Sequence, residues 1–392
     1  MALIKLNTRS LADDSVTTDK IADDLQKGRK NLIINGEMRI DQRQKGASVT
    51  IPAYTSFYVM DRWHGYGQPD ASKYSLRRVA ATGGALAAGH LFCAQVTSAG
   101  AHTQTANDIY FIRQFIEGNQ MAHLRWGTSD AKACVLSFWV KSHKTGTHGG
   151  AILDAASAWS HPFTYSVSSA NTWEYKTVSI AGPTAGGTFN TNNNKGCQVV
   201  FSLSVGSSFD GTAGAWANSP NAFGAVGAVN VLDAASTWSI TGVQLEKGTV
   251  ATPYEFQNTT DLLAQCYRYY YKIGPASDGD DALSSSSGGT NTAYGLAYVY
   301  NSNNCRPHVR FPVKMRAAPG GVETSGTASD YRIYYGADST VVMSNVPAHD
   351  IASCNDWFGG CDASSSVFNT NEVAYLRSNG VNSYLAWSVE FT

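Results

Sequence analysis

Short runs of alternating apolar and polar residues cover most of the chain after its first thirty residues. The runs at 74–80, 109–116, 134–142 and 197–205 are rich in Val, Ile, Phe and Tyr, the residue types that favour strands. Clusters of Gly, Asn, Ser and Thr separate the runs, as expected of turns. Strands at this spacing, with few helical periods between them, predict an antiparallel β-sandwich.

The same alternation predicts further strands in two groups. In the first group we expect strands also at 90–97, 163–169, 174–181 and 238–248, and in the second at 293–301, 308–315, 330–336, 340–346, 373–378 and 384–392. The first group predicts a β-sandwich domain over 31–258, and the second predicts a C-terminal β-sandwich over 259–392. The expected fold class is therefore all-β.

The first thirty residues differ from the rest because they are polar and contain no aromatic side chain. "LADDSVTTDK" is followed by "IADDLQKGRK", so an apolar residue before Ala-Asp-Asp recurs after ten positions. Such a segment cannot bury a core of its own. We expect residues 1–30 to form an extended or short helical attachment and trimerisation segment; the alternative is a disordered tail.

The stretch "AQCYRYYYKIG", residues 264–274, places four tyrosines within five positions between the two predicted domains. We expect a short helix or turn here that leads into a strand, with Thr260 or Asp261 as the helix N-cap. Buried packing is the commoner use of aromatic rings. We therefore expect the tyrosine run to pack at the domain junction, the alternative being a ligand platform.

Composition and charge exclude several classes of protein. The chain has 392 residues, enough for two or three domains, and its 29 basic residues nearly balance its 30 acidic ones. With no run of Lys or Arg, we expect no nucleic-acid partner. No uncharged stretch has the composition of a membrane span, so we expect no membrane insertion. The seven scattered cysteines form no C-x-x-C pair, which favours free thiols, including Cys354 and Cys361.

No motif of a common catalytic or cofactor site is present. The chain lacks H-E-x-x-H, G-x-S-x-G and the phosphate-binding loop. Carboxylates that a polysaccharide-cleaving enzyme would need as a pair mostly stand beside Gly, Ser or Ala, where Asp makes turns: Asp154, Asp210, Asp233, Asp278, Asp280, Asp281, Asp356 and Asp362. We therefore predict no catalytic residue, no cofactor and no bound metal.

Aromatic side chains are the remaining candidates for binding, because flat rings can pack on the apolar faces of sugars. Trp63, Trp139 and Trp238 lie in strand-like runs and are expected in the core. For receptor binding, we select rings of the C-terminal domain: Tyr298, Tyr300, Tyr334, Tyr335, Trp357 and Phe358. Two rings in loops of the first domain, Trp159 and Trp216, are the alternative glycan contacts.

Five stretches occur in a distinctive order: "NLIINGEMRIDQRQKG", "YVMDRW", "WSITGVQLEKGTVATPYEFQ", "CYRYYYK" and "FPVKMRAAP". Together with the opening "LADDSVTTDKIADD", this set resembles tail fibre and receptor-binding proteins of tailed bacteriophages. The resemblance covers roughly 1–320, and residues 320–392 match nothing that we can place. It implies a homotrimeric protein of the virion tail, assembled in the host cytoplasm and attached to tail or baseplate proteins through residues 1–30.

The resemblance further implies a jelly roll like that of carbohydrate-binding modules over 31–258, in which "NLIING" and "WSITGVQLEKG" lie beside each other. Many such modules hold a structural calcium, and Glu37 would fill the first ligand position. The last strand has Gly242, Val243 and Gln244 where an Asp would be needed. This departure from the pattern is why no metal is predicted.

Three functions follow from these observations. We expect a non-enzymatic adhesin that binds a bacterial surface glycan or protein through loops of the C-terminal domain, with several copies acting together. The first alternative is a depolymerase of capsule or lipopolysaccharide, which needs two facing carboxylates. The second alternative is a purely structural connector of the tail.

Overall fold

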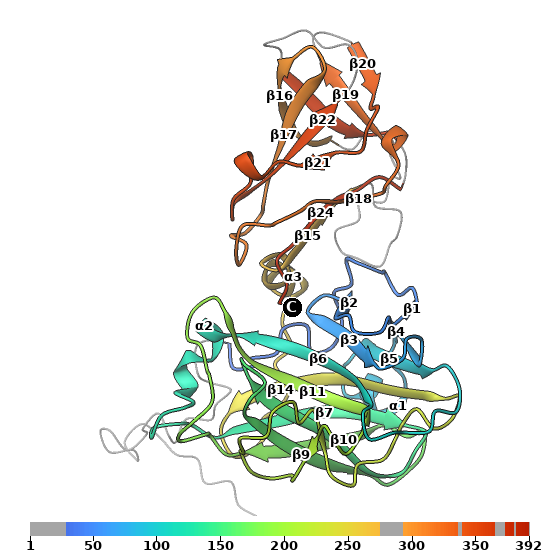
Figure 1. Cartoon of the computed structure of the whole chain (residues 1–392), viewed down its shortest axis with the longest axis vertical. Coiled ribbons are helices and arrows are strands. Elements are labelled where there is room, and N and C mark those ends of the chain that lie inside the picture. The colour runs from blue at the N-terminus through green and yellow to red at the C-terminus, as the bar shows by residue number, and fades with distance from the viewer. Residues whose placement is uncertain (1–28, 275–292, 336–338, 365–372, 380–381, 392) are drawn as a thin grey trace, which may run out of the picture.

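Two domains built from antiparallel strands are stacked along the long axis of the molecule (Figure 1). The computed structural model describes residues 29–274, 293–335, 339–364, 373–379 and 382–391. Most of the predicted attachment segment, residues 1–28, lies outside the described residues. The prediction of an all-β chain with a jelly-roll sandwich and a second C-terminal sandwich is confirmed by the strand pairings given below.

The first domain is a sandwich of two six-stranded sheets. One sheet has the order β1 (Val49–Thr50), β4 (Tyr74–Ala80), β5 (Phe92–Ser98), β14 (Thr237–Lys247), β7 (Cys134–Ser142) and β10 (Glu174–Ile180). The other has the order β2 (Phe57–Met60), β3 (Trp63–Gln68), β6 (Ile109–Glu117), β11 (Lys195–Val205), β8 (Gly146–Asp154) and β9 (Ser160–Val167). The chain passes repeatedly from one sheet to the other, as in a jelly roll.

The core of the first domain fills the space between its two sheets. Trp63 and Trp238 are buried there, as predicted, with Phe201 tilted against both rings. Trp139 is only half-buried, because it lies on the outer side of β7 beside the short helix α1 (Gly83–Ala87). Outward-facing positions of a strand alternate with core positions, so the sequence run alone could not assign Trp139 to a side.

The beginning and end of the first domain lie side by side. The backbone N–H of Leu32 donates to the carbonyl of Leu245, and that of Val243 donates to the carbonyl of Gly36, both at 2.9 Å. The Asn31 amide also donates to the Val243 carbonyl, at 3.1 Å. Residues 31–36 therefore line the last strand of the sandwich, as the resemblance implied, although they form no regular strand themselves.

The sequence reading missed strand β8 because its first half, "GTHGG", has the composition of a turn. Within the sheet, a Cβ atom on Gly150 would lie 2.4 Å from both the Phe163 ring and the Val200 carbonyl. Glycine is required at this position because a neighbouring ring occupies the place of a side chain. Gly150 thus reflects packing between strands rather than a turn.

The C-terminal domain pairs a seven-stranded sheet with a three-stranded one. The larger sheet has the order β20 (Ser339–Val342), β19 (Tyr331–Tyr335), β23 (Val373–Ser378), β16 (Ala293–Asn301), β17 (Asn304–Arg310), β22 (Phe358–Ser364) and β21 (Ala348–His349). The smaller sheet has the order β15 (Tyr270–Ile273), β24 (Leu385–Ser388) and β18 (Glu323–Thr324). The Trp387 ring of β24 lies in the core between them.

Strand β22 was also missed, and again a glycine in the strand faces a ring. A Cβ atom on Gly359 would lie 2.4 Å from the Trp387 indole, so the ring occupies the space that a side chain would need there. The remaining elements are short: the strands β12 (Asp210–Gly211) and β13 (Gly224–Ala225), and the helices α2 (Gly118–Met121), η3 (Ala122–Leu124), η4 (Ala328–Asp330) and η5 (Ile351–Ser353). None of the helices in the described part of the chain has the length and apolar character required to cross a membrane.

The tyrosine run forms the joint between the domains, as predicted. Helix α3 (Thr259–Tyr267) leads into β15, and its N-cap is Asn258 rather than Thr260 or Asp261, because the Asn258 side chain accepts from the Asp261 N–H. Tyr269 contacts the first domain, with its ring 3.5 Å from the Arg62 guanidinium. Tyr271 faces the second core, where its ring stacks with that of Trp387. The run therefore packs against both domains.

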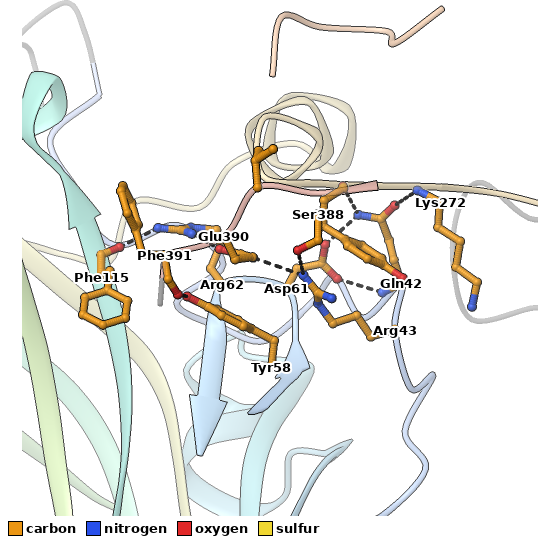
Figure 2. A network of polar contacts seen from close by, with 12 residues as sticks. Gln42, Arg43, Tyr58, Asp61, Arg62, Phe115, Lys272, Ser388, Glu390 and Phe391 are labelled. Atoms are coloured by element: carbon orange, nitrogen blue, oxygen red, sulfur yellow. Dashed lines mark hydrogen bonds and ion pairs between the residues drawn. The ribbon is translucent and has the colours of Figure 1, made fainter. Parts of the chain in front are cut away.

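A buried polar network connects the first domain to the residues that follow β24 (Figure 2). Arg62 of the first domain forms an ion pair with Glu390, and its guanidinium also donates to the Phe115 carbonyl. The Tyr58 hydroxyl donates to the Phe391 carbonyl at 2.8 Å. Beside them, Asp61 accepts two hydrogen bonds from Gln42. The last described residues thus tie the C-terminal domain to the sandwich.

Candidate functional site

Strand β16 exposes a row of large side chains on the outer face of the seven-stranded sheet. Tyr294, Ala297 and Val299 point into the core, whereas Leu296, Tyr298 and Tyr300 are exposed. Side chains of a strand alternate between the two faces of its sheet, which explains the division from Leu296 to Tyr300. The register shift between Ala293 and Gly295 places Tyr294 on the core side. Tyr298, with 52 % of its surface exposed, is a large ring that contributes little to the core.

Neighbouring strands extend this row across the sheet. Tyr375 of β23 lies directly opposite Leu296, and Tyr334 of β19 lies directly opposite Tyr375. On the other side of β16, Leu296 faces His308 of β17. Directly opposite side chains on one face are within contact range. Apolar and aromatic groups from several strands therefore form one continuous surface.

We name this surface the tyrosine–arginine face. It comprises Leu296, Tyr298, Tyr300, Arg306, His308, Arg310, Arg332, Tyr334, Tyr375 and Arg377. Exposed apolar residues at its edges are Val342, Val373 and Phe358. Contiguous exposed apolar surface of this kind commonly marks a site of interaction.

One end of the face carries a small polar cluster around Arg306. The Arg306 Nε atom lies 2.7 Å from an Asp350 carboxylate oxygen and 3.1 Å from one of Asp362. The guanidinium lies 5.0 Å from the Tyr300 ring centroid. Burial and the charge of Asp362 raise the pKa of the Tyr300 hydroxyl. Arg306 is thus held in place by two carboxylates and an aromatic ring.

The pKa of Asp350 is lowered in spite of its burial. Burial by itself would raise the pKa, but the Ser353 hydroxyl and the Ala352 N–H donate to the carboxylate, and Arg306 lies beside it. Hydrogen bonds and positive charge favour the ionised form of a carboxyl group. Asp350 is therefore a stable carboxylate that orients Arg306.

The structure brings together some of the predicted receptor-binding rings and separates others. Tyr298, Tyr300 and Tyr334 share the face, and Phe358 lies at its far edge opposite Arg310. Trp357 is exposed in the loop before β22. Tyr335 does not belong to the face: it is the next residue after Tyr334 and packs on the domain core, since consecutive side chains point to opposite sides.

The two alternative glycan contacts lie together on the first domain. Trp159 and Trp216 flank the isolated bridge between Ser160 and Ala217. Trp216 is half-buried: its indole donates to the Ala181 carbonyl at 2.7 Å and its ring packs edge-on against Trp126, His161 and Phe189. These contacts hold the ring in a structural cluster.

Sequence reasoning missed Tyr375, Leu296 and the arginines of the face. The signal was present in the strict alternation of "VAYLRS" and "AYGLAYVYN", where every second residue is large or charged. What could not be found from the sequence is which strands lie next to each other: β23 pairs with both β19 and β16 across long stretches of chain. The face is therefore assembled by strand order.

A cavity of about 350 Å³ lies at the joint. The first domain lines it with Arg43, Gln44, Ser56, Phe57 and Tyr58, and the C-terminal domain with Tyr270, Lys272, Glu323 and Tyr384. The Arg43 guanidinium lies 3.6 Å from the Tyr270 ring centroid. The cavity depends on the relative placement of both domains, whereas the tyrosine–arginine face belongs to one domain.

The residue that the resemblance implied for calcium has protein partners. The Glu37 carboxylate is buried, 3.0 Å from the Arg39 guanidinium and 3.8 Å from His90. Within the described residues, no group of three or more His, Cys, Asp or Glu side chains is placed to hold a metal ion. All seven cysteines are free thiols.

Comparison with known proteins gives only distant similarities. No protein-family model matches the chain, and no curated protein matches it. Among solved structures, it is similar to the enzymatically active domain of bacteriophage CBA120 tailspike protein 4, with 11 % identity and a TM-score of 0.29 over 56 % of this chain and 21 % of the tailspike.

Two further solved structures are similar over the same share of this chain, 56 %, and over the whole of their own length. They are a putative sugar binding protein from Bacteroides thetaiotaomicron, with 14 % identity and a TM-score of 0.32, and TmCBM61 in complex with β-1,4-galactotriose, with 9 % identity and a TM-score of 0.28. Similarities of this size carry no argument about function, and the fold description rests on the strand pairings.

Proposed function

We propose that this chain is a receptor-binding protein of a bacteriophage tail that recognises a glycan of the bacterial surface through the tyrosine–arginine face. The observation that carries the proposal is the row of exposed large side chains formed by Tyr298, Leu296, Tyr375 and Tyr334 on adjacent strands. Exposed rings on a rigid sheet offer flat surfaces for sugar rings with little loss of conformational entropy. The ordered sequence motifs support the tail-fibre assignment.

A face of this kind binds weakly when it acts alone, since it is open and not a deep pocket. Several copies joined in one particle would convert weak contacts into firm adsorption. The proposed homotrimer on the virion tail, attached through residues 1–30, provides such copies. Light scattering of the full-length protein tests this part: a mass of three 41.9 kDa chains is expected, and a lone chain would contradict the trimer.

We propose that the face binds its glycan without cleaving it. Glycoside hydrolysis needs one carboxyl group with a raised pKa to act as the acid. Asp350 and Asp362, the carboxylates beside Arg306, are engaged in ion pairs, and the pKa of Asp350 is lowered. Their arrangement suits positioning of an arginine rather than proton transfer.

Adsorption to a panel of bacterial strains tests the proposal. The labelled full-length protein is expected to bind a subset of strains, and the double variant Tyr298→Ala/Tyr375→Ala should lose at least tenfold in affinity. Tyr175→Ala on the sandwich is the matched control, because Tyr175 and Tyr375 have 45 % and 46 % of their surfaces exposed. If the double variant adsorbs as strongly as the unchanged protein, the tyrosine–arginine face is not the receptor-binding surface.

The same experiment separates the alternatives. Release of reducing ends from the polysaccharide of a bound strain would indicate a depolymerase, and we expect none. Failure of the intact protein to bind any strain of the panel would favour a structural connector. Neither alternative predicts that Tyr298 and Tyr375 affect adsorption while Tyr175 does not.

A further inference from the structure

Strand β6 places a buried arginine on the outer face of its sheet. Ile112 and Ile116 of this strand point into the core of the sandwich. Because side chains alternate along a strand, Arg113 and Phe115 lie on the opposite side. Only 9 % of Arg113 is exposed, and its guanidinium carbon lies 4.3 Å from the Phe115 ring centroid. The sheet therefore carries a nearly buried positive charge outside the core.

The polar partners of Arg113 among the described residues are all neutral. Its guanidinium donates to the His64 imidazole, to the Gln198 amide oxygen at 2.7 Å and to the Ser56 hydroxyl at 3.0 Å. Hydrogen bonds to neutral groups orient a guanidinium but leave its charge in place. A buried charge is normally paired with an opposite one, because burial removes its hydration.

Two other buried arginines of the first domain do have a carboxylate beside them. Arg62 forms an ion pair with Glu390, and the Arg78 Nε atom lies 3.9 Å from an Asp41 carboxylate oxygen. The fold thus compensates buried guanidinium charge elsewhere in the usual way. Arg113 departs from this pattern, which indicates that a group other than the described residues supplies its counter-charge.

A second cation lies beside the same aromatic ring. The Lys195 ammonium of β11 is 4.7 Å from the Phe115 ring centroid, and Lys195 is half-buried. Burial and the charge of Arg113 both lower the pKa of Lys195, and the charge of Asp154 opposes them. The Asp154 carboxylate already accepts hydrogen bonds from three backbone N–H groups. Arg113 and Lys195 are therefore two like charges around one ring.

The same cluster has more hydrogen-bond donors than acceptors. A guanidinium has more N–H groups than the three hydrogen bonds that Arg113 donates here. His64 accepts from Arg113 at Nε2, so the neutral ring carries its proton on Nδ1, which has no partner in the described part of the chain. Burial, and then the charge of Arg113, lower the pKa of His64 well below its usual value. This surroundings suits a negatively charged ligand that only accepts hydrogen bonds.

We propose that Arg113 and Lys195 form a binding site for a phosphate group on the outer face of this sheet. The remaining guanidinium N–H groups and the ammonium donate to the phosphate oxygens, and the negative charge offsets both cations. A phosphate suits the site better than a carboxylate, because it has more acceptor oxygens and more charge to set against two cations. The phosphate is either a free ion or a substituent of a bacterial surface polymer, and both offer the same oxygens.

The proposed site lies in the first domain and shares no residue with the tyrosine–arginine face. It is therefore a second binding site in addition to the proposed function. Titration of the full-length protein with inorganic phosphate tests it by calorimetry, with the ionic strength held constant by NaCl. We expect saturable binding of phosphate and weaker binding of acetate. Phosphate should also raise the melting temperature until the site is filled, whereas exclusion of the salt from the protein surface gives no saturation.

Substitutions test the assignment to these two cations. Arg113→Gln should weaken phosphate binding by roughly tenfold or more, because hydrogen bonds from a charged group are lost. Arg77→Gln is the matched control and should leave binding unchanged, since Arg77 is exposed on the same domain and also donates to a glutamine, Gln95. Near-UV circular dichroism checks that the variants fold. Lys195→Gln, at a half-buried position, should also weaken binding and provides the test if Arg113→Gln does not fold.

Phosphomannan, a polymer that carries phosphate groups, distinguishes the two sources. If it binds more tightly than inorganic phosphate and depends on Arg113, the ligand is a polymer substituent; if inorganic phosphate alone binds, the ligand is the free ion. The inference is wrong if neither binds saturably, if acetate binds as tightly as phosphate, or if binding is unchanged in both the Arg113 and Lys195 variants. Loss of strain adsorption in the Tyr298→Ala/Tyr375→Ala variant, with no phosphate binding, would leave the proposed function standing and this inference alone refuted.

Discussion

Arg62 and Glu390 form a buried ion pair that joins the first domain to the end of the described chain (Figure 2). Only 1 % of the Arg62 side chain and 3 % of the Glu390 side chain are exposed. Arg62 also lies 3.5 Å from the Tyr269 ring centroid, so residues far apart in sequence meet at this guanidinium. The pair therefore fixes how the C-terminal domain, and with it the tyrosine–arginine face, is mounted on the sandwich.

Removal of one partner of this pair should destabilise the protein strongly. Glu390→Ala leaves the Arg62 charge buried without its carboxylate, which typically costs about 3–5 kcal/mol in free energy of unfolding. Urea denaturation measures the effect. Asp130→Ala is the control, because Asp130 and Arg125 form an exposed pair expected to contribute less than about 1 kcal/mol. Equal effects of the two changes would show that the joint does not depend on the ion pair.

Asp61 should make stability depend on pH near neutrality. Burial raises the pKa of Asp61 from 3.8 to about 7, although Arg43 and the hydrogen bonds from Gln42 oppose the change. Between these two values the folded protein keeps a proton that the unfolded chain has released. The free energy of unfolding therefore falls as pH rises from about 4 to 7, by up to about 4 kcal/mol.

The Asp61→Asn variant isolates this contribution. Its absolute stability will differ, because an amide cannot accept both hydrogen bonds from Gln42. What the test compares is the slope of the free energy of unfolding against pH between 4 and 7, which should be less negative in the variant. Identical slopes would mean that Asp61 titrates near its ordinary pKa.

Gly359 should be required for the two sheets of the C-terminal domain to pack. Gly359→Ala places a methyl group against the Trp387 indole, and overpacking of this kind commonly costs about 1–3 kcal/mol. Thermal unfolding followed by tryptophan fluorescence measures the loss. Gly320→Ala is the matched control, because no atom lies within 4 Å of the added carbon; an equal loss in both variants would contradict the packing argument.

Substitutions along β16 should separate binding from stability. Tyr294 is buried and its hydroxyl donates to the Ser383 hydroxyl at 2.8 Å, so Tyr294→Ala should cost about 3–5 kcal/mol. Tyr298→Ala, at an exposed position of the same strand, should change the free energy of unfolding by less than about 0.5 kcal/mol. Chemical denaturation measures the free energy of unfolding of both variants and tests the two expected values. A large loss for Tyr298→Ala would mean that this ring is structural.

The sequence predicted the strands whose side chains alternate regularly, and it failed where glycine replaced that pattern. Strands β4, β6, β7 and β11 lie within about two residues of the expected ranges. Strands β8 and β22 were not predicted because Gly150 and Gly359 accommodate rings from other strands. Strand propensity is estimated from residues that are close together in the sequence. It therefore does not include contacts with side chains from distant parts of the chain.

The candidate binding surface was likewise predicted only in part. Tyr298, Tyr300 and Tyr334 were selected from their residue type, but nothing local distinguished them from Tyr335, which faces the core. The position of the tyrosine run at the domain junction was predicted correctly, because a dense cluster of aromatic rings between two domains is stabilised by packing against both. The partners of that run were not predictable: the Arg62 guanidinium lies over the Tyr269 ring, and the Glu117 carboxylate accepts a hydrogen bond from the Tyr269 hydroxyl.

By itself, then, the sequence determined the all-β class, the succession of two β domains and the burial of the tyrosine run, because periodicity and composition act through near neighbours along the chain. Tertiary structure alone decided which rings share a face, the register pairing of Arg332 with Arg377 and the ion pair of Arg62 with Glu390. These relationships depend on strand order and domain placement, which arise when distant segments bury their apolar surfaces together.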